Sequence, residues 1–162
     1  MTPAIVRKQI SPQPVLVIER RIKPSDLAKT LGETLPHVVM YAQRTGLALA
    51  GQPFTRYLEW GPGLWTIEAG MPVTALSSRT GEKISAGSHA IKEDTLPGGF
   101  VATMTHTGPY DGLGGAHAAI QQWIEEHRVT AKGAPWEVYV TDPADYPDPK
   151  DWKTDLFWPL AG

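Results

Sequence analysis

The chain of 162 residues contains no cysteine, which excludes disulfides, thiolate nucleophiles and cysteine-based metal sites. Its 15 basic and 17 acidic residues form no basic stripe, so we expect no binding of nucleic acid by this chain alone. No apolar run is long enough for a signal peptide or a membrane span, and the sequence therefore predicts a soluble, cytoplasmic protein without membrane contact. No linker or block of charge divides the chain, which favours one domain over residues 1–162.

The five histidines show no i, i+4 pair and no His-Glu-x-x-His motif, so we predict no metal site. The glycine-rich segments lack both the P-loop ending and the dinucleotide spacing, and we expect no cofactor. Six tryptophans and five tyrosines are, by contrast, many for a chain of this size. They hint at a ligand cavity, with a tryptophan-rich core as the alternative.

The clearest pattern in the sequence is an internal repeat, in which five residues of the first half recur 82 to 87 positions later. The pairs are Pro24 and Pro109, Gly51 and Gly133, Pro53 and Pro135, Tyr57 and Tyr139, and Pro72 and Pro159. A near-constant offset indicates a duplicated unit, here over about residues 13–76 and 99–160. Each repeat predicts an apolar strand, a proline-initiated helix and a two-stranded hairpin. We therefore expect an α+β fold in which an antiparallel sheet and two main helices form one pseudo-two-fold domain with a ligand cleft where the repeats meet.

Apolar periodicity gives the elements of each repeat. In the first, strands are expected at residues 15–22, 54–60 and 64–73, around a helix that begins near residue 24 and ends at Gly46. In the second, strands are expected at 100–106, 136–141 and 152–160, around a helix opened by residues 107–111. Residues 77–86 form a linking stretch, and 88–94 fit either a strand or a short helical turn.

Three glycines fall in the first turns of the second helix: Gly112, Gly114 and Gly115. Each weakens the helix by about 1 kcal/mol relative to alanine, unless it permits a close approach of the backbone.

Glu137 stands out because a carboxylate in the middle of an apolar strand is unusual. If the helices cover the face that carries Trp136 and Val138, strand alternation turns Glu137 and Tyr139 toward the cleft. A solvated glutamate on the wet face of the sheet is the alternative. Enclosed by aromatic rings, the carboxylate would instead anchor a cationic ligand or act as a general base.

Two acidic residues and one histidine are further candidates for the site. Glu68 and Asp155 correspond at an offset of 87 and would form paired carboxylates if they lay near Glu137, but we expect both to be surface residues near strand ends. His106 ends a strand and is the histidine expected to touch a ligand, with a hydrogen bond inside the turn as the alternative.

Three segments of the second repeat carry a family resemblance: His106–Asp111 (HTGPYD), Pro135–Pro143 (PWEVYVTDP) and Thr154–Leu160 (TDLFWPL). With them the chain resembles, over about residues 13–160, the GyrI-like small-molecule-binding domain, an effector-binding domain found alone or fused to transcription activators. The resemblance implies a duplicated strand-helix-strand-strand architecture. It also implies a single glutamate at the floor of an aromatic cleft that holds lipophilic, often cationic, compounds.

The motifs of that family fall on particular residues of this sequence. The floor glutamate falls on Glu137 and the cleft tyrosine of Gly-Pro-Tyr on Tyr110. By strand position, Tyr57, Tyr139 and Phe157 are expected to be wall residues. Trp65 is a further expected contact, with ordinary core packing as the alternative, and His106 completes the set. No DNA-binding segment precedes the domain, so we expect a standalone binder.

The leading hypothesis is a standalone, multidrug-type protein that senses or sequesters lipophilic, including cationic, small molecules. Two alternatives stay open. Some relatives are associated with hydrolysis of cyclopropane-containing toxins, and here Glu137 would then be the catalytic general base while Tyr110 or Tyr139 polarises a carbonyl. A gyrase-inhibitor-like module would instead bind a protein partner, a topoisomerase or a transcription regulator, through its surface.

Overall fold

The computed structural model describes residues 4–75, 83–86 and 89–161. The chain divides into two compact units. The first unit is Pro12–Pro97, and the second unit combines Met1–Ser11 with Gly98–Gly162.

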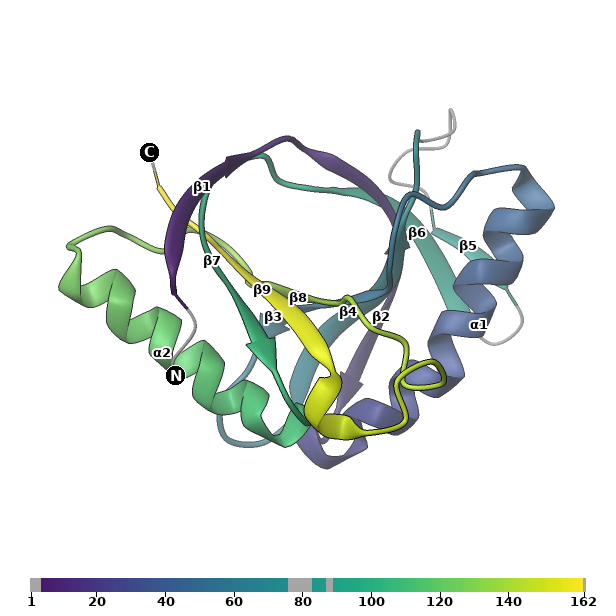
Figure 1. Ribbon diagram of the computed structural model, residues 1–162. Coiled ribbons are helices and arrows are strands. Elements are labelled where there is room, and N and C mark those ends of the chain that lie inside the picture. The colour runs from purple at the N-terminus through teal and green to yellow at the C-terminus, as the bar shows by residue number, and fades with distance from the viewer. Residues whose placement is uncertain (1–3, 76–82, 87–88, 162) are drawn as a thin grey trace. The chain divides into compact units, whose positions relative to one another are not determined.

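In the first unit, helix α1 (Leu27–Thr45) packs on β2 (Gln13–Ile22) and β4 (Trp65–Pro72), as Figure 1 shows. The antiparallel strand order is β3-β4-β2-β6-β5, with β3 (Phe54–Glu59), β5 (Lys83–Ala86) and β6 (His89–Leu96). A 3-10 turn, η1 (Pro24–Asp26), leads into α1, because the fixed φ of proline suits the first turn of a helix. The helix ends at Gly46, whose φ of 74° lies in the left-handed region that favours glycine.

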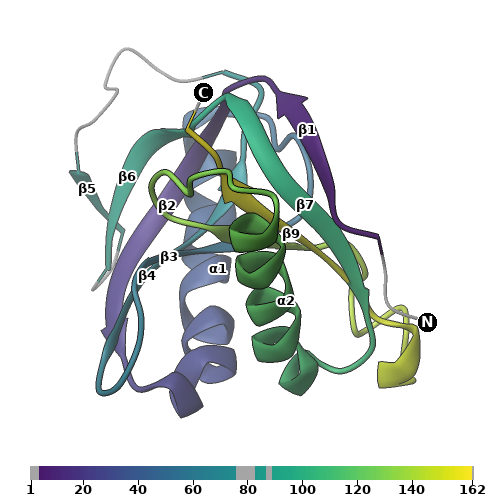
Figure 2. The same cartoon turned by 90° about the vertical axis from the view of Figure 1, so that its left-hand side faces the viewer.

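The second unit repeats this order of elements. Strand β7 (Gly99–Thr107) leads through the 3-10 turn η2 (Tyr110–Gly112) into α2 (Leu113–Glu126). Strand β8 (Trp136–Tyr139), a 3-10 turn η3 (Pro149–Asp151) and β9 (Lys153–Pro159) follow. The antiparallel order is β1-β7-β9-β8, with β1 (Val6–Ile10) paired along β7 (Figure 2). Helix α2 packs on β7.

Strand pairing reproduces the offsets of the sequence repeat. Tyr57 of β3 pairs with Ile67 of β4, and Tyr139 of β8 pairs with Thr154 of β9. The offsets are 139 − 57 = 82 and 154 − 67 = 87, the two values found for the hairpin residues in the sequence. The expected α+β class, with two helices and antiparallel strands, is therefore confirmed.

Two strands differ from what the sequence predicts. Strand β1 was not expected, because most of its residues are exposed and it has no apolar face to detect. Of the ambiguous residues 88–94, those from His89 onward belong to strand β6, where Lys92, Glu93 and Asp94 in succession hide the strand pattern, and Ser88 lies outside the described residues. Most of the expected linking stretch, residues 77–86, lies outside the described residues, which there include only β5.

The core of the first unit lies between α1 and its sheet. Leu16 and Ile18 of β2 pack with Val38 and Tyr41 of α1. None of the helices that the structure describes has the length and apolar character needed to cross a membrane.

Candidate functional site

One face of the sheet in the second unit carries an unusual set of side chains. Glu137 and Tyr139 of β8 alternate to the same face. Glu137 pairs with Leu156 of β9, so Leu156 and, two residues on, Trp158 share that face. Helix α2 covers it, because His117 of α2 hydrogen-bonds to both Glu137 and Trp158.

The opposite face of the same sheet carries Trp136 and Phe157. They are paired in register and their rings stack, with centroids 5.4 Å apart and planes 17° apart. The premise that a helix covers the Trp136 face is therefore wrong, since α2 lies on the Glu137 face. Phe157, expected as a wall residue beside Glu137, lies on the other side of the sheet.

Glu137 is fully buried, with 0% of its surface exposed. Its Oε1 lies 2.8 Å from Nε2 of His117, and its Oε2 accepts a hydrogen bond of 2.8 Å from the Tyr139 hydroxyl. No Lys or Arg among the described residues forms an ion pair with it. The alternative of a solvated glutamate on a wet sheet face is therefore wrong.

Trp158 fixes the tautomer of His117. The indole Nε1–H of Trp158 donates to Nδ1 of His117 over 3.0 Å. An indole nitrogen only donates, so Nδ1 is the acceptor and the proton of the neutral imidazole is on Nε2. His117 thus donates to Glu137 as a neutral group. The negative charge of Glu137 is met by hydrogen bonds from neutral donors rather than by a fixed positive charge.

Tyr110, the residue that matches the family's cleft tyrosine, lies in an aromatic cluster of the same unit. Its ring centroid is 5.5 Å from that of Tyr139 and 4.7 Å from that of Trp152. Partial burial raises the pKa of the Tyr110 hydroxyl above its ordinary value, and the negative charges of Glu137 and Asp142 raise it further. Tyr110 therefore senses the charge of Glu137, and its part in a ligand site stays a prediction.

Thr154 adds a buried polar atom without a partner. It pairs with Tyr139, is 0% exposed, and its hydroxyl has no hydrogen-bond partner among the described residues. Leaving such a group unsatisfied costs about 1–3 kcal/mol. A water molecule or a polar group of a ligand would relieve that cost.

Three residues of this site were not expected from the sequence: His117, Thr154 and Trp158. His117 had a detectable signal, since it lies four residues after Leu113 and three before Ile120, on the buried face of α2. In the sequence, Thr154 and Trp158 are ordinary strand residues. Only the pairing of Thr154 with Tyr139 and the hydrogen bond from Trp158 to His117 connect them to the site.

His106 takes the alternative role proposed for it, a hydrogen bond within the turn. Its Nε2 lies 3.1 Å from the carbonyl oxygen of Pro109, which can only accept, so the histidine donates. The ring lies over Gly112, where an added Cβ would be 2.8 Å from Cε1 of His106. Of the three glycines that open α2, Gly112 thus permits a close approach, whereas Gly114 and Gly115 have no neighbour within 4 Å among the described residues.

Tyr57 and Trp65 belong to the first unit, where their rings meet edge to face with centroids 5.8 Å apart. Tyr57 packs with Ile22 and Ile67, and Trp65 donates its indole N–H to the carbonyl of Gly61 over 3.0 Å. Their part in a ligand site stays a prediction.

The two other acids do not join Glu137. Asp155 pairs with Val138, whose side chain points away from the Glu137 face, and accepts a 2.6 Å hydrogen bond from Thr105. Glu68 belongs to the first unit and is only 3% exposed, so its assignment to the surface is wrong.

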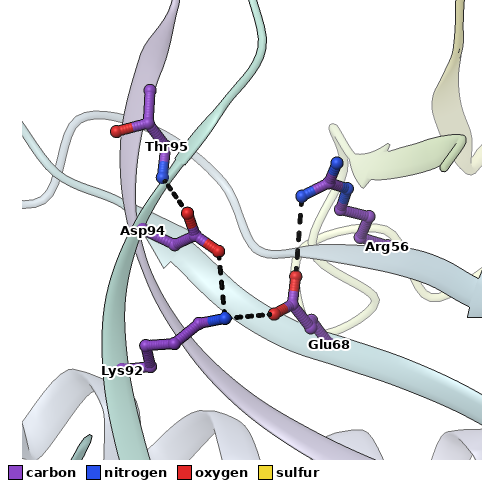
Figure 3. A network of polar contacts seen from close by, with 5 residues as sticks. All are labelled: Arg56, Glu68, Lys92, Asp94 and Thr95. Carbon is purple, nitrogen blue, oxygen red and sulfur yellow. Dashed lines mark hydrogen bonds and ion pairs between the residues drawn. The ribbon is translucent and has the colours of Figure 1, made fainter. Parts of the chain in front are cut away.

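Glu68 is held instead in a network of charged side chains (Figure 3). Lys92 lies 3.3 Å and Arg56 3.8 Å from its carboxylate oxygens, and Lys92 also lies 3.2 Å from Asp94. Burial raises the pKa of Glu68, and the attraction of Lys92 and Arg56 offsets this only in part. For Lys92 the balance is reversed: burial lowers its pKa, but Glu68 and Asp94 together raise it above the ordinary value. Attraction by neighbouring charges outweighs burial for Lys92 but not for Glu68, because Lys92 is more exposed and has two acidic partners.

No group of three or more His, Asp or Glu residues in the described part of the chain is placed to hold a metal ion. The candidate site consists of one buried carboxylate, its neutral donors and an adjoining aromatic cluster.

The GyrI-like small molecule binding domain family matches residues 1–161, and the chain belongs to that family. No curated protein matches the chain.

Solved structures share the fold. The C-terminal domain of EcmrR gives a TM-score of 0.81 at 23% identity, over 99% of each chain. In the EcmrR–DNA complex the TM-score is 0.80 at 21% identity, and the match covers 98% of this chain but only 57% of that one. SAV2435 bound to tetraphenylphosphonium gives 0.64 at 10% identity, over 100% of this chain and 95% of that one. A hydrolase encoded by lin2189 of Listeria innocua gives 0.66 at 12% identity, over 97% and 91%.

Proposed function

We propose that this chain binds lipophilic cations and that the carboxylate of Glu137 is their anionic contact. The observation that carries the proposal is a fully buried glutamate with neutral hydrogen-bond donors on both oxygens. Transfer of a carboxylate from water to a protein interior costs several kcal/mol, which hydrogen bonds repay only in part. A bound cation would supply the missing opposite charge.

Aromatic side chains near Glu137 suit the remainder of such a ligand. Tyr139 donates to the carboxylate, Tyr110 lies against the ring of Tyr139, and Trp152 extends the cluster. Aromatic rings offer both apolar contact area and cation–π attraction to a positively charged compound. Because Glu137 is fully buried without a ligand, side chains around it have to move when one binds. Half-buried Tyr110 and Trp152 are the natural candidates within this unit.

The hydrogen bonds also bear on the hydrolase alternative. A general base needs an oxygen lone pair directed at the water it deprotonates. Oxygens Oε1 and Oε2 of Glu137 already accept from His117 and Tyr139. Each oxygen keeps a second lone pair, so a turnover assay, described below, has to separate the hydrolase from a charge-binding role.

The test uses two probes of the same shape and opposite charge, tetraphenylphosphonium and tetraphenylborate. Calorimetric titration of the wild-type protein is expected to give binding of the cation and much weaker binding of the anion. Glu137→Gln keeps the side-chain shape: its carbonyl accepts from His117 and its amide donates to the Tyr139 oxygen. Loss of the charged contact should weaken cation binding by about 10- to 150-fold, or roughly 1.5–3 kcal/mol.

Asp155→Asn is the matched control, because it removes a carboxylate from the opposite face of the same sheet. It should leave cation binding unchanged. Equal binding of the two probes, or equal cation affinity in wild type and Glu137→Gln, would refute the proposed role of Glu137. Turnover of a strained electrophile that is lost in Glu137→Gln would favour the hydrolase instead.

A further inference from the structure

The hydroxyl of Thr154 on β9 is a buried polar group that the proposed function does not use. Thr154 is 0% exposed, and its hydroxyl makes no hydrogen bond with any residue that the structure describes. Buried polar side chains nearly always have a hydrogen-bond partner, so an unpaired one calls for a group from outside the chain.

Strand register places this hydroxyl on the same face of the sheet as the carboxylate of Glu137. Thr154 pairs with Tyr139, which alternates to the Glu137 face. Leu156, two residues further along β9, pairs with Glu137 itself. Thr154 and Glu137 are therefore diagonal neighbours on adjacent strands, a relation in which Cα atoms lie about 7–8 Å apart. A ligand whose charge contacts the carboxylate can reach the hydroxyl with a polar group a few bonds away.

Three aromatic rings lie on the Thr154 side of the sheet. Tyr139 is its cross-strand neighbour. Trp152 precedes Thr154 by two residues in extended backbone, with φ −70° and ψ 139°, so its side chain alternates to the same face. The ring of Tyr110 contacts both of the others, with centroids 5.5 Å from Tyr139 and 4.7 Å from Trp152. Movement of the half-buried Tyr110 and Trp152, which binding requires, would uncover the Thr154 hydroxyl beside the ligand.

The backbone next to Thr154 is held in place independently of these rings. The amide of Gly108 donates to the carbonyl of Trp152 over 2.8 Å. The amide of Val140 donates to the carbonyl of Lys153 over 3.0 Å. Thr154 therefore presents its hydroxyl from a paired strand, and little conformational freedom is lost when a ligand group bonds to it.

We propose that Thr154 is a second ligand contact and a specificity-determining residue: its hydroxyl hydrogen-bonds to a polar group that the ligand carries near its positive charge. The inference rests on the proposed function, which places the cationic centre of the ligand at Glu137. A threonine hydroxyl both donates and accepts, so a hydroxyl or a carbonyl oxygen of the ligand suits it. The preferred ligands are therefore lipophilic cations with an oxygen group a few bonds from the charged atom, rather than purely hydrocarbon cations.

The test compares two permanent cations of nearly the same shape, (2-hydroxyethyl)triphenylphosphonium and n-propyltriphenylphosphonium. They differ only in a terminal hydroxyl against a methyl group. Calorimetric titration of the wild type and of Thr154→Val gives the ratio of the two affinities in each protein. Valine keeps the side-chain shape and removes the hydroxyl, so the preference for the hydroxyethyl compound should fall about 3- to 10-fold. The ratio cancels any change in packing that affects both cations alike.

Three variants serve as controls for this ratio. Thr154→Ser retains the hydroxyl and should keep the ratio of the wild type. Thr103→Val removes a hydroxyl from the opposite face of the same sheet, because Thr103 pairs with Phe157, and should also leave the ratio unchanged. Glu137→Gln should weaken both cations together, because the charged contact is common to them.

A measurement without ligand adds an independent check. Thr154→Val should unfold at the same temperature as the wild type or at a higher one, because an apolar group replaces a buried hydroxyl that has no partner. A clearly lower unfolding temperature would mean that the hydroxyl already has a partner within the protein, and would overturn the inference.

The binding results separate the inference from the proposed function. If both cations bind through Glu137 but Thr154→Val leaves their ratio unchanged, the inference is wrong and the proposed function stands; a bound water that alone satisfies the hydroxyl would give this result. If neither cation binds the wild type, or both bind Glu137→Gln as tightly, the proposed function is wrong and the inference fails with it.

Discussion

The hydroxyl of Tyr139 should contribute more to stability than an ordinary buried hydroxyl, because it donates to an ionised acceptor. It lies 2.8 Å from Oε2 of Glu137, and both residues are buried. Hydrogen bonds to charged groups contribute about 1.5–3 kcal/mol, against about 0.5–1.5 kcal/mol for neutral pairs. Tyr139→Phe keeps the ring and removes only this donor, so we expect a loss of about 1.5–3 kcal/mol in the free energy of unfolding.

A double-mutant cycle isolates the contribution of the charge. In the Glu137→Gln background the same Tyr139→Phe change breaks a neutral hydrogen bond, and the expected loss falls to about 0.5–1.5 kcal/mol. The coupling free energy should therefore be about 1–2 kcal/mol, well above the error of additivity for independent sites. Urea unfolding of the four proteins near neutral pH, followed by tryptophan fluorescence and far-UV circular dichroism, measures it.

The result that would refute this reasoning is additivity. If Tyr139→Phe costs the same in both backgrounds, within about 0.5 kcal/mol, Glu137 carries no charge that the hydroxyl senses. A Glu137→Gln protein that unfolds several kcal/mol more easily than wild type would also count against the account. It would mean that the donors around Glu137 satisfy the ionised carboxylate better than the neutral amide, even without a ligand.

Two further predictions concern stability alone. Gly112→Ala should destabilise the protein by about 0.5–1.5 kcal/mol, because its Cβ would lie 2.8 Å from Cε1 of His106 and would push this ring off the carbonyl of Pro109. Gly114→Ala, which has no neighbour within 4 Å among the described residues, should instead stabilise α2 by about 0.5–1 kcal/mol. Thermal unfolding of both variants checks this, and equal shifts would contradict it. Burial raises the pKa of Glu68 above its ordinary 4.5, so the stability that its protonated form contributes is present below pH 4.5 and is lost as pH rises through the raised value. Glu68→Gln should flatten that part of the curve of unfolding free energy against pH, and an unchanged slope in urea titrations would contradict the assignment.

The repeat could be predicted from sequence because its markers are residues with strong backbone preferences. Proline at the start of each helix and the Gly-x-Pro before each hairpin are fixed by local geometry, so their spacing survives when side chains diverge. The pairing of Tyr57 with Ile67 and of Tyr139 with Thr154 shows that the same spacing also sets the register of the hairpins. The spacing of the proline and glycine markers and the register of the hairpins therefore agree in both units.

The site was only partly predictable, because burial of a polar residue leaves no mark in apolar periodicity. A carboxylate in an apolar strand singles out Glu137, but the sequence does not show which face of the sheet the helix covers. For Glu68, the sequence does not show that Lys92 and Arg56 lie close enough to let it be buried. Metal-ligand spacing says nothing of His117, whereas its position on the buried face of α2 is the informative feature.

A crystal structure of the protein with tetraphenylphosphonium tests the central claim most directly. The account predicts the phosphonium centre against the carboxylate of Glu137, with phenyl rings on Tyr110 or Tyr139 and the bond from Trp158 to His117 intact. A ligand bound elsewhere, with Glu137 still enclosed by the same neutral donors, would contradict it.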